Sequence, residues 1–178
     1  DLLGRAPARL DRATIDRFIK GKRILITGSA GSVGSELARQ VAGLQPELLL
    51  LVDQSENSLF YLESEVRSSS PAVHLEAQIV DVTDLAEVNW LMSQYHPQIV
   101  LHAAAHKHVH FMERAPSRAV KNNVGGTYNM ARCAMTYDVE TFVLVSTDKA
   151  VKPTGVMGVT KRLCERLVQE MDGQGSTR

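Results

Sequence analysis

Residues 23–34, which read RILITGSAGSVG, constrain the fold more than any other stretch of this chain. An apolar segment leads into a glycine-rich turn, and an amphipathic pattern follows with apolar residues at Val33, Leu37 and Val41. Strand, glycine turn and helix in that order form the βα unit that binds dinucleotides. An ordinary glycine-rich βα turn without a ligand is the alternative interpretation, and residues elsewhere in the chain are needed to distinguish the two.

Each glycine of this turn has a physical reason to be glycine. Gly28 permits a tight turn, Gly31 lets the backbone approach a pyrophosphate, and Gly34 lets the helix lie close to the strand. The free N–H groups and the dipole of the helix N-terminus then face the phosphates. The residues predicted to bind the phosphates are Gly28, Ser29, Gly31, Ser32, Val33 and Gly34.

Composition restricts the class of protein. A chain of 178 residues, 44% hydrophobic and 22% charged, is typical of a soluble globular domain, and its zero net charge gives no reason to expect nucleic acid as a partner. Cys133 and Cys164 fall in helix-like apolar patterns, which predicts reduced core thiols. The lack of a signal peptide and of an apolar run of about 18 residues predicts a cytoplasmic protein.

Apolar and amphipathic segments alternate along the chain. Strands are predicted at residues 22–27, 47–52, 74–80, 98–103 and 140–146. Helices are expected to begin near Asp84, with Glu87 completing an acidic capping box, and after Pro116, the latter running toward Tyr137. The pattern predicts a doubly wound α/β domain with a parallel sheet, whose ligands bind at the carboxyl ends of the strands.

The domain boundaries follow from the same pattern. Residues 1–20 are predicted to form a lead-in helix or linker, and residues 21–178 a single Rossmann-like domain. The chain opens without methionine and stops abruptly, so we expect it to be a piece of a longer protein.

The second and third predicted strands end in acidic residues. Asp53 follows the glycines by roughly 20 residues, the interval at which an acid binds the adenosine ribose. A carboxylate there would accept from the ribose hydroxyls and repel a 2′-phosphate, which favours NAD over NADP. An N-cap before Ser55 is the alternative role, and the two can coexist. Asp81, with Val82 after it, could accept from the adenine amino group.

The fourth predicted strand ends in a segment rich in histidine and alanine. Its histidines are His102, His106, His108 and His110. The small residues that would let a backbone pass close to the cofactor are Ala103, Ala104 and Ala105. Imidazoles two residues apart can converge on a metal, but no cysteine or carboxylate stands at ligand spacing. We therefore predict no metal, and polar residues that line the mouth of a substrate site.

Ser146, Thr147, Asp148 and Lys149 follow the fifth predicted strand. A hydroxyl, an acid and an amine side by side suit proton transfer, although these residue types also favour ordinary turns. Lys161 is expected on the first turns of the last helix, near the cofactor end of the sheet.

Together these motifs resemble the extended short-chain dehydrogenase/reductases. Residues 102–109, 146–149 and 156–161 are more narrowly similar to the CapD/WbpM-like nucleotide-sugar 4,6-dehydratases of polysaccharide biosynthesis, which act on UDP-N-acetylglucosamine. The resemblance covers nearly the whole chain. It implies NAD as cofactor, a UDP-sugar as substrate, a homo-oligomer and a membrane-anchored parent protein. The resemblance also implies a further C-terminal segment that holds the sugar. This piece alone is therefore expected to bind NAD but to catalyse the reaction poorly or not at all.

The resemblance implies an internal redox cycle. Hydride leaves C4 of the sugar for NAD, water is eliminated across C5–C6, and hydride returns to C6. By motif, Thr147 would contact the C4 oxygen, Asp148 would be the acid and Lys149 the base. Lys161 would bind the nicotinamide ribose. The residues expected to contact the substrate are His106, Lys107 and Asn123.

One position departs from the family's pattern. The usual Tyr-x-x-x-Lys motif has Met157 in place of the tyrosine, and a thioether cannot take up and release the proton at C4. Either Asp148 acts as the base through Thr147, or the oxidation is slow. A nucleotide-sugar 4-epimerase is the second enzyme hypothesis, and a non-catalytic NAD-binding or oligomerisation module is the third.

Overall fold

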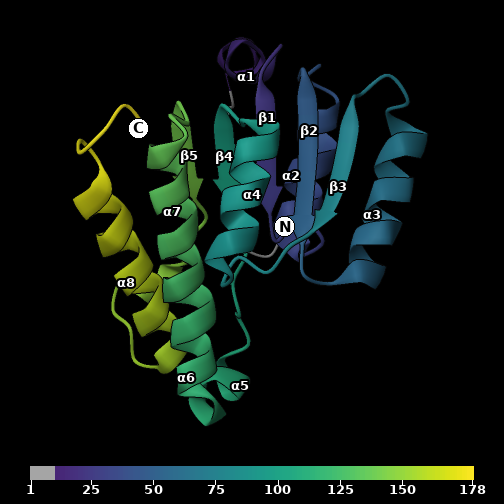
Figure 1. The fold of residues 1–178 in the computed structure, drawn as a ribbon. Coiled ribbons are helices and arrows are strands. Elements are labelled where there is room, and N and C mark those ends of the chain that lie inside the picture. The colour runs from purple at the N-terminus through teal and green to yellow at the C-terminus, as the bar shows by residue number, and fades with distance from the viewer. Residues whose placement is uncertain (1–10) are drawn as a thin grey trace.

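The computed structural model describes residues 11–178 as a five-stranded sheet between two layers of helices (Figure 1). The strands are β1 (Arg23–Thr27), β2 (Leu48–Asp53), β3 (Leu75–Ile79), β4 (Ile99–His102) and β5 (Thr141–Leu144). Their order is β3-β2-β1-β4-β5, and every pair is parallel. The predicted α/β class is confirmed, and each predicted strand agrees with the structure to within two residues.

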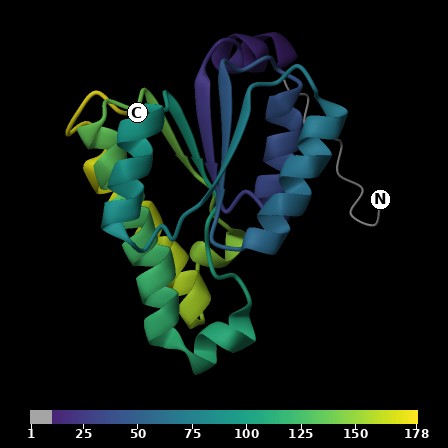
Figure 2. The same ribbon diagram turned by 45° about the vertical axis from the view of Figure 1, so that its right-hand side comes forward.

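Helices cover both faces of the sheet (Figure 2). The α-helices are α1 (Arg12–Ile19), α2 (Ser32–Ala42), α3 (Glu56–Ser69), α4 (Leu85–Tyr95), α5 (Val109–Arg114), α6 (Pro116–Ala119), α7 (Gly126–Thr136) and α8 (Val156–Met171). A π-helix, Val120–Gly125, joins α6 to α7, and a short 3₁₀ turn, Asp148–Ala150, precedes α8. Within the described residues, no helix has the length and apolar character needed to cross a membrane.

Two hydrophobic clusters explain why the strands are continuous apolar runs. Leu25, Leu50 and Val100 face α4 and α7, whereas their neighbours Ile24 and Leu49 face α2 and α3. Since successive side chains of a strand point to opposite faces, a strand covered on both sides must be apolar at every position. Cys133 and Cys164 are buried free thiols, as predicted.

Two helix predictions differ in detail from the structure. Asp84 caps α4 as expected, but the carboxylate of Glu87 accepts from the N–H of Asp81 and so does not complete a capping box with Asp84. The helix predicted after Pro116 contains the π-helix, which hydrophobic periodicity does not reveal. Of the predicted lead-in segment, α1 is present, and residues 1–10 lie outside the described residues.

Candidate functional site

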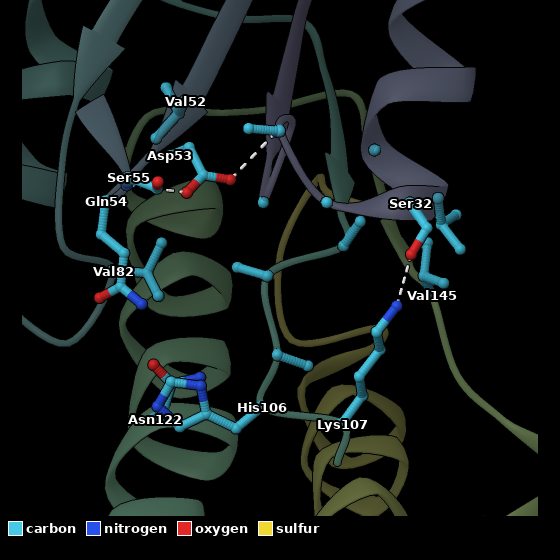
Figure 3. A pocket seen from close by; sticks show the side chains of 18 of the residues that line it. Ser32, Val52, Asp53, Gln54, Ser55, Val82, His106, Lys107, Asn122 and Val145 are labelled. Atoms are coloured by element: carbon cyan, nitrogen blue, oxygen red, sulfur yellow. Dashed lines mark hydrogen bonds between the residues drawn. The ribbon is translucent and has the colours of Figure 1, made fainter. Parts of the chain in front are cut away.

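A cleft of about 550 Å³ opens at the carboxyl ends of the strands (Figure 3), within the size range of small-molecule sites. It runs from the end of β2 across the glycine turn to the first turns of α8. The predicted site residues that line it are Gly28, Gly31, Ser32, Val33, Gly34, Asp53, Val82, Ala103, Ala104, Ala105, His106, Lys107, Thr147, Lys149, Met157 and Lys161. A cleft therefore lies at the edge of the sheet where ligands are expected, and that these residues bind a ligand stays a prediction.

The glycine turn is shaped by backbone contacts. Gly28 has a φ of 61°, and a Cβ there would lie 2.6 Å from the Cα of Ala104. A Cβ on Gly34 would collide with the carbonyl oxygen of Gly28, so only glycine lets α2 sit this close to β1. At Gly31 the nearest atom to a Cβ would be that same oxygen, at 3.2 Å. The tight turn and the close helix packing are thus as predicted.

The N-terminus of α2 offers unpaired donors to the cleft. Its N-cap, Gly31, has no side chain that could accept a hydrogen bond. Ser35 is the first residue of the helix whose N–H has a backbone partner, the carbonyl oxygen of Gly31. Within the described part of the chain, the N–H groups of Ser32, Val33 and Gly34 have no acceptor. Three free donors at the positive end of a helix are a ready site for a phosphate.

Asp53 connects the glycine turn to the end of β2. One carboxylate oxygen accepts from the N–H of Ala30 at 3.0 Å, and the other accepts from the N–H of Ser55 at 2.9 Å. Ser55 itself is the N-cap of α3, so the alternative prediction of an Asp53 N-cap is wrong. Each oxygen of an ionised carboxylate can accept a second hydrogen bond, which leaves acceptor capacity facing the cleft.

His102 is not at the mouth of the site, which corrects the prediction made for the histidine segment. The side chain is 1% exposed, with Nδ1 2.6 Å from the Thr27 hydroxyl and Nε2 3.1 Å from the Thr127 hydroxyl. Burial, and secondarily the charge of Lys161, lowers the pKa of His102 to about 3. The imidazole is therefore neutral at physiological pH.

The hydrogen bonds around His102 all run in one direction. The Cys164 thiol donates to the Asn123 carbonyl oxygen, and the Thr127 hydroxyl donates to the Cys164 sulfur. Thr127 must then accept from Nε2–H of His102, and Nδ1 must accept from Thr27, which assigns the tautomer. This buried chain fastens the ends of β1 and β4 to α7 and α8 beneath the cleft.

Asn123 has a different place from the substrate contact predicted for it. It is 1% exposed, and its side-chain amide accepts from the N–H of His106 at 2.7 Å and donates to the same residue's carbonyl at 3.1 Å. It also donates to the Thr160 hydroxyl. Asn123 thus holds the loop after β4, while its neighbour Asn122 lines the cleft.

Three lysines line the far part of the cleft. Lys107 reaches across it and donates to the hydroxyl of Ser32 (Figure 3). Lys149 has a side chain that is 57% exposed, whereas Lys161 is 6% exposed and burial lowers its pKa. Among the described residues 11–178, Asp53 is the one acidic residue in the lining, at the opposite end. The charged side chains of the cleft are therefore acidic at the β2 end and basic toward α8.

Asp148 lies beside the cleft and does not line it. Its side chain is 88% exposed, and its carboxylate accepts from the Thr147 hydroxyl at 2.9 Å. That hydrogen bond, and then the charge of Lys149, lowers the pKa of Asp148, which favours the ionised form. Thr147 and Lys149 do line the cleft, so Asp148 contacts it through the Thr147 hydroxyl and through the Lys149 ammonium, which lies 3.5 Å from its carboxylate.

Two further predicted residues lie outside the cleft lining. Ser29 is fully buried, and its hydroxyl has no partner among residues 11–178. The carboxylate of Asp81 accepts from the N–H of Thr83 at 2.8 Å, as in an ordinary turn. In the described part of the chain, no three His, Cys, Asp or Glu side chains are grouped to hold a metal.

Sequence reasoning missed several lining residues. They are Ala30, Val52, Gln54, Ser55, Ser58, Val80, Asn122 and Val145, whereas Ser146, which was named after the fifth strand, also lines the cleft. Most directly follow or end a strand, so the rule that ligands meet the carboxyl ends of strands was a signal that could have found them.

Comparison with known proteins places the chain in a family. Residues 24–178 match the family model described as polysaccharide biosynthesis protein. The chain is 45% identical over 172 residues to the probable polysaccharide biosynthesis protein EpsC of Bacillus subtilis, covering 96% of this chain and 29% of that protein. It is 30% identical to the UDP-N-acetylglucosamine 4,6-dehydratase (inverting) of Campylobacter jejuni, covering 84% of this chain and 43% of the relative.

A solved structure confirms the fold. The UDP-glucose-4-epimerase of Stenotrophomonas maltophila superposes with a TM-score of 0.77 at 20% identity, covering 86% of this chain and 49% of that one. The chain thus spans less than half the length of the curated relatives cited. On the match over residues 24–178, the chain belongs to the polysaccharide biosynthesis protein family.

Proposed function

We propose that this chain is the NAD-binding part of a nucleotide-sugar 4,6-dehydratase that converts UDP-N-acetylglucosamine to a 4-keto-6-deoxy sugar. The observation that carries the proposal is the order of charged and hydrogen-bonding groups along the cleft. Free N–H groups of Ser32, Val33 and Gly34 lie between the acidic end at Asp53 and the basic end near Lys161. A dinucleotide offers the matching groups in that order, with ribose hydroxyls at one end and phosphates in the middle.

The residues of the cleft fit NAD. Asp53 would accept from the adenosine ribose hydroxyls, the start of α2 would bind the pyrophosphate, and Lys161 would approach the second ribose. Ala103 and its two alanine neighbours line the cleft with small side chains, which leaves room for a flat ring. When bound, NAD supplies a hydride acceptor and donor.

The lysines suit the elimination step. Once C4 is a ketone, loss of water across C5–C6 needs a base at C5 and an acid at the C6 hydroxyl. Lys149 lines the cleft and is the proposed base, and the nearby Thr147 hydroxyl is the proposed contact to the C4 oxygen. Asp148 would exchange protons with the site through Thr147, to which it is hydrogen-bonded. Met157 lines the cleft where the family's tyrosine would stand and can neither take up nor release a proton.

Asp53→Asn is expected to weaken NAD binding about tenfold, because a neutral amide makes weaker hydrogen bonds to ribose hydroxyls than a carboxylate does. Asparagine keeps an oxygen that can still accept from the N–H of Ala30, so the glycine turn should be retained. Calorimetric titration measures the affinity. The exposed carboxylate Glu170→Gln on α8 is the control, and equal affinities in all three proteins would show that Asp53 does not contact the ribose.

Turnover tests the proposed reaction and its base. The natural protein that contains this chain should convert UDP-N-acetylglucosamine to a product lighter by one water, seen by mass spectrometry. Lys149→Ala should lower kcat by about a hundredfold or more, the usual contribution of a general base. Lys152→Ala is the matched control, since that lysine is exposed and lies outside the cleft lining. Full activity of the Lys149 variant would refute the base assignment.

A nucleotide-sugar 4-epimerase is the second candidate, and the exposure of Asp148 favours it. An epimerase needs no acid–base pair at C5 and C6, so it tolerates an aspartate outside the cleft. The same assay separates the two, because an epimerase inverts C4 without changing the mass. NAD binding without turnover would point to the third hypothesis, a non-catalytic module. The homo-oligomer, the cytoplasmic location and the membrane-anchored parent stay predictions.

A further inference from the structure

The helix that carries Met157 and Lys161 is capped by a side chain from elsewhere in the chain. The N-cap of α8 is Gly155, in extended conformation and without a side chain that could accept. The carboxylate of Glu113, on α5, accepts instead from the N–H of Val156 at 2.7 Å. A negative charge at the start of a sixteen-residue helix is also favoured by the helix dipole.

Two glycines let the start of α8 be held closely from two sides. A Cβ on Gly155 would lie 2.6 Å from the Glu113 carboxylate, and a Cβ on Gly158 would lie 2.5 Å from the carbonyl oxygen of Lys149. The first turn of α8 is therefore fitted between α5 and the segment that begins at Lys149. A larger residue at Gly158 would collide with the Lys149 backbone and push that segment away from α8, whereas one at Gly155 would displace the Glu113 carboxylate from the helix start.

Apolar packing supports the same junction. Met112 of α5, Ala119 of α6 and Met157 of α8 are buried together in a small cluster separate from the two faces of the sheet, with Val156 against it. Figure 1 shows α5 and α6 gathered at the end of α8 that lies away from the chain terminus. The Glu113 hydrogen bond, made by an exposed carboxylate, adds to this packing and to the close contact at Gly158 in holding the helix start.

The junction controls the geometry of the cleft. Met157 is on the turn that Glu113 caps, Lys161 is one turn further along, and both line the cleft. Lys149 lines the same cleft from the segment that packs on Gly158. A shift of the start of α8 would thus move Met157 and Lys161 relative to Lys149.

We propose that Glu113 is a positioning residue, whose carboxylate sets the start of α8 and thereby places Met157 and Lys161 against Lys149. The structural part of this inference stands on contacts within the chain, and its catalytic part rests on the proposed function. Glu113 does not line the cleft, so in this proposal it acts through α8.

Three variants test the proposal in the NMR spectrum of the chain without ligand. Glu113→Ala should shift the ε-methyl resonance of Met157 and speed hydrogen exchange of the Val156 amide about fivefold, as expected for a lost cap. Glu113→Gln keeps an accepting oxygen and should restore both signals. Glu170→Ala removes an exposed carboxylate from the other end of α8 and should change neither.

Kinetics of the natural protein supply the functional readout. Glu113→Ala should lower kcat about tenfold while KM for the sugar changes less than about twofold, because misplaced groups slow chemistry more than binding. Glu113→Gln should recover most of kcat. Wild-type methyl and exchange signals in the alanine variant, or a glutamine variant as impaired as the alanine one, would overturn the proposal. If the wild-type protein shows no turnover, the proposed function fails, and the NMR signals alone decide the role of Glu113.

Discussion

Gly34→Ala is expected to destabilise the domain by about 3 kcal/mol, the upper range for overpacking a core. The added methyl would meet the carbonyl oxygen of Gly28 and the Cα of Ser29, and both are backbone atoms of the glycine turn that cannot rotate away. Either α2 moves off β1 or the turn opens, and both disturb the buried helix–strand contact. Urea unfolding followed by circular dichroism measures the change.

Gly31→Ala is the matched control. Its φ of −74° suits any residue, and the nearest atom to the new methyl is the Gly28 oxygen at 3.2 Å, so the fold should lose less than about 1 kcal/mol. The methyl would nevertheless stand where we expect the pyrophosphate, and NAD binding should fall at least about tenfold. A Gly34→Ala protein as stable as wild type would contradict the packing role of Gly34.

Acid is expected to destabilise the domain through His102. The folded pKa is about 3 and the unfolded pKa is near 6.5, so between these values the unfolded chain binds a proton that the folded chain excludes. Stability is therefore fully present above pH 6.5 and falls as the pH drops toward 3. One such histidine makes the free energy of unfolding fall by up to about 1.4 kcal/mol for each unit by which the pH drops.

The comparison of wild type with His102→Asn isolates this contribution. Between pH 6.5 and 5 carboxylates contribute little, so the slope of unfolding free energy against pH should be flatter in the variant by about 1 kcal/mol per unit. Asparagine is also neutral and removes the titration without adding a charge. Equal slopes in the two proteins would mean that His102 is protonated in the fold or reaches solvent.

Much of the fold follows from sequence because its signals are local. A strand covered on both faces must be apolar throughout, so the run 48–52 identifies β2 without any knowledge of its neighbours. The glycine turn and Asp53 are found the same way, since a parallel βαβ unit sets the distance between them. The position of Gly34 in the motif predicts that α2 packs closely on the end of β1, and the structure shows this close contact.

The rest depends on tertiary contacts that spacing does not encode. Asn122 and Asn123 are adjacent in the π-helix, yet Asn122 lines the cleft and Asn123 is hydrogen-bonded to the loop after β4. His102 looks like its exposed neighbours in a histidine-rich segment, and only the threonines on β1 and α7 show it to be internal. Glu113 accepts from the N–H of Val156, 43 residues later in the sequence, and no local motif indicates this pairing.

Calorimetric titration of this chain with NAD and with NADP tests the central claim most directly, because the residues proposed to hold the cofactor all line the cleft described. We expect one NAD bound per chain, and NADP bound at least about tenfold more weakly, since Asp53 would repel the 2′-phosphate. No heat with millimolar NAD, or equal affinity for the two dinucleotides, would contradict the account.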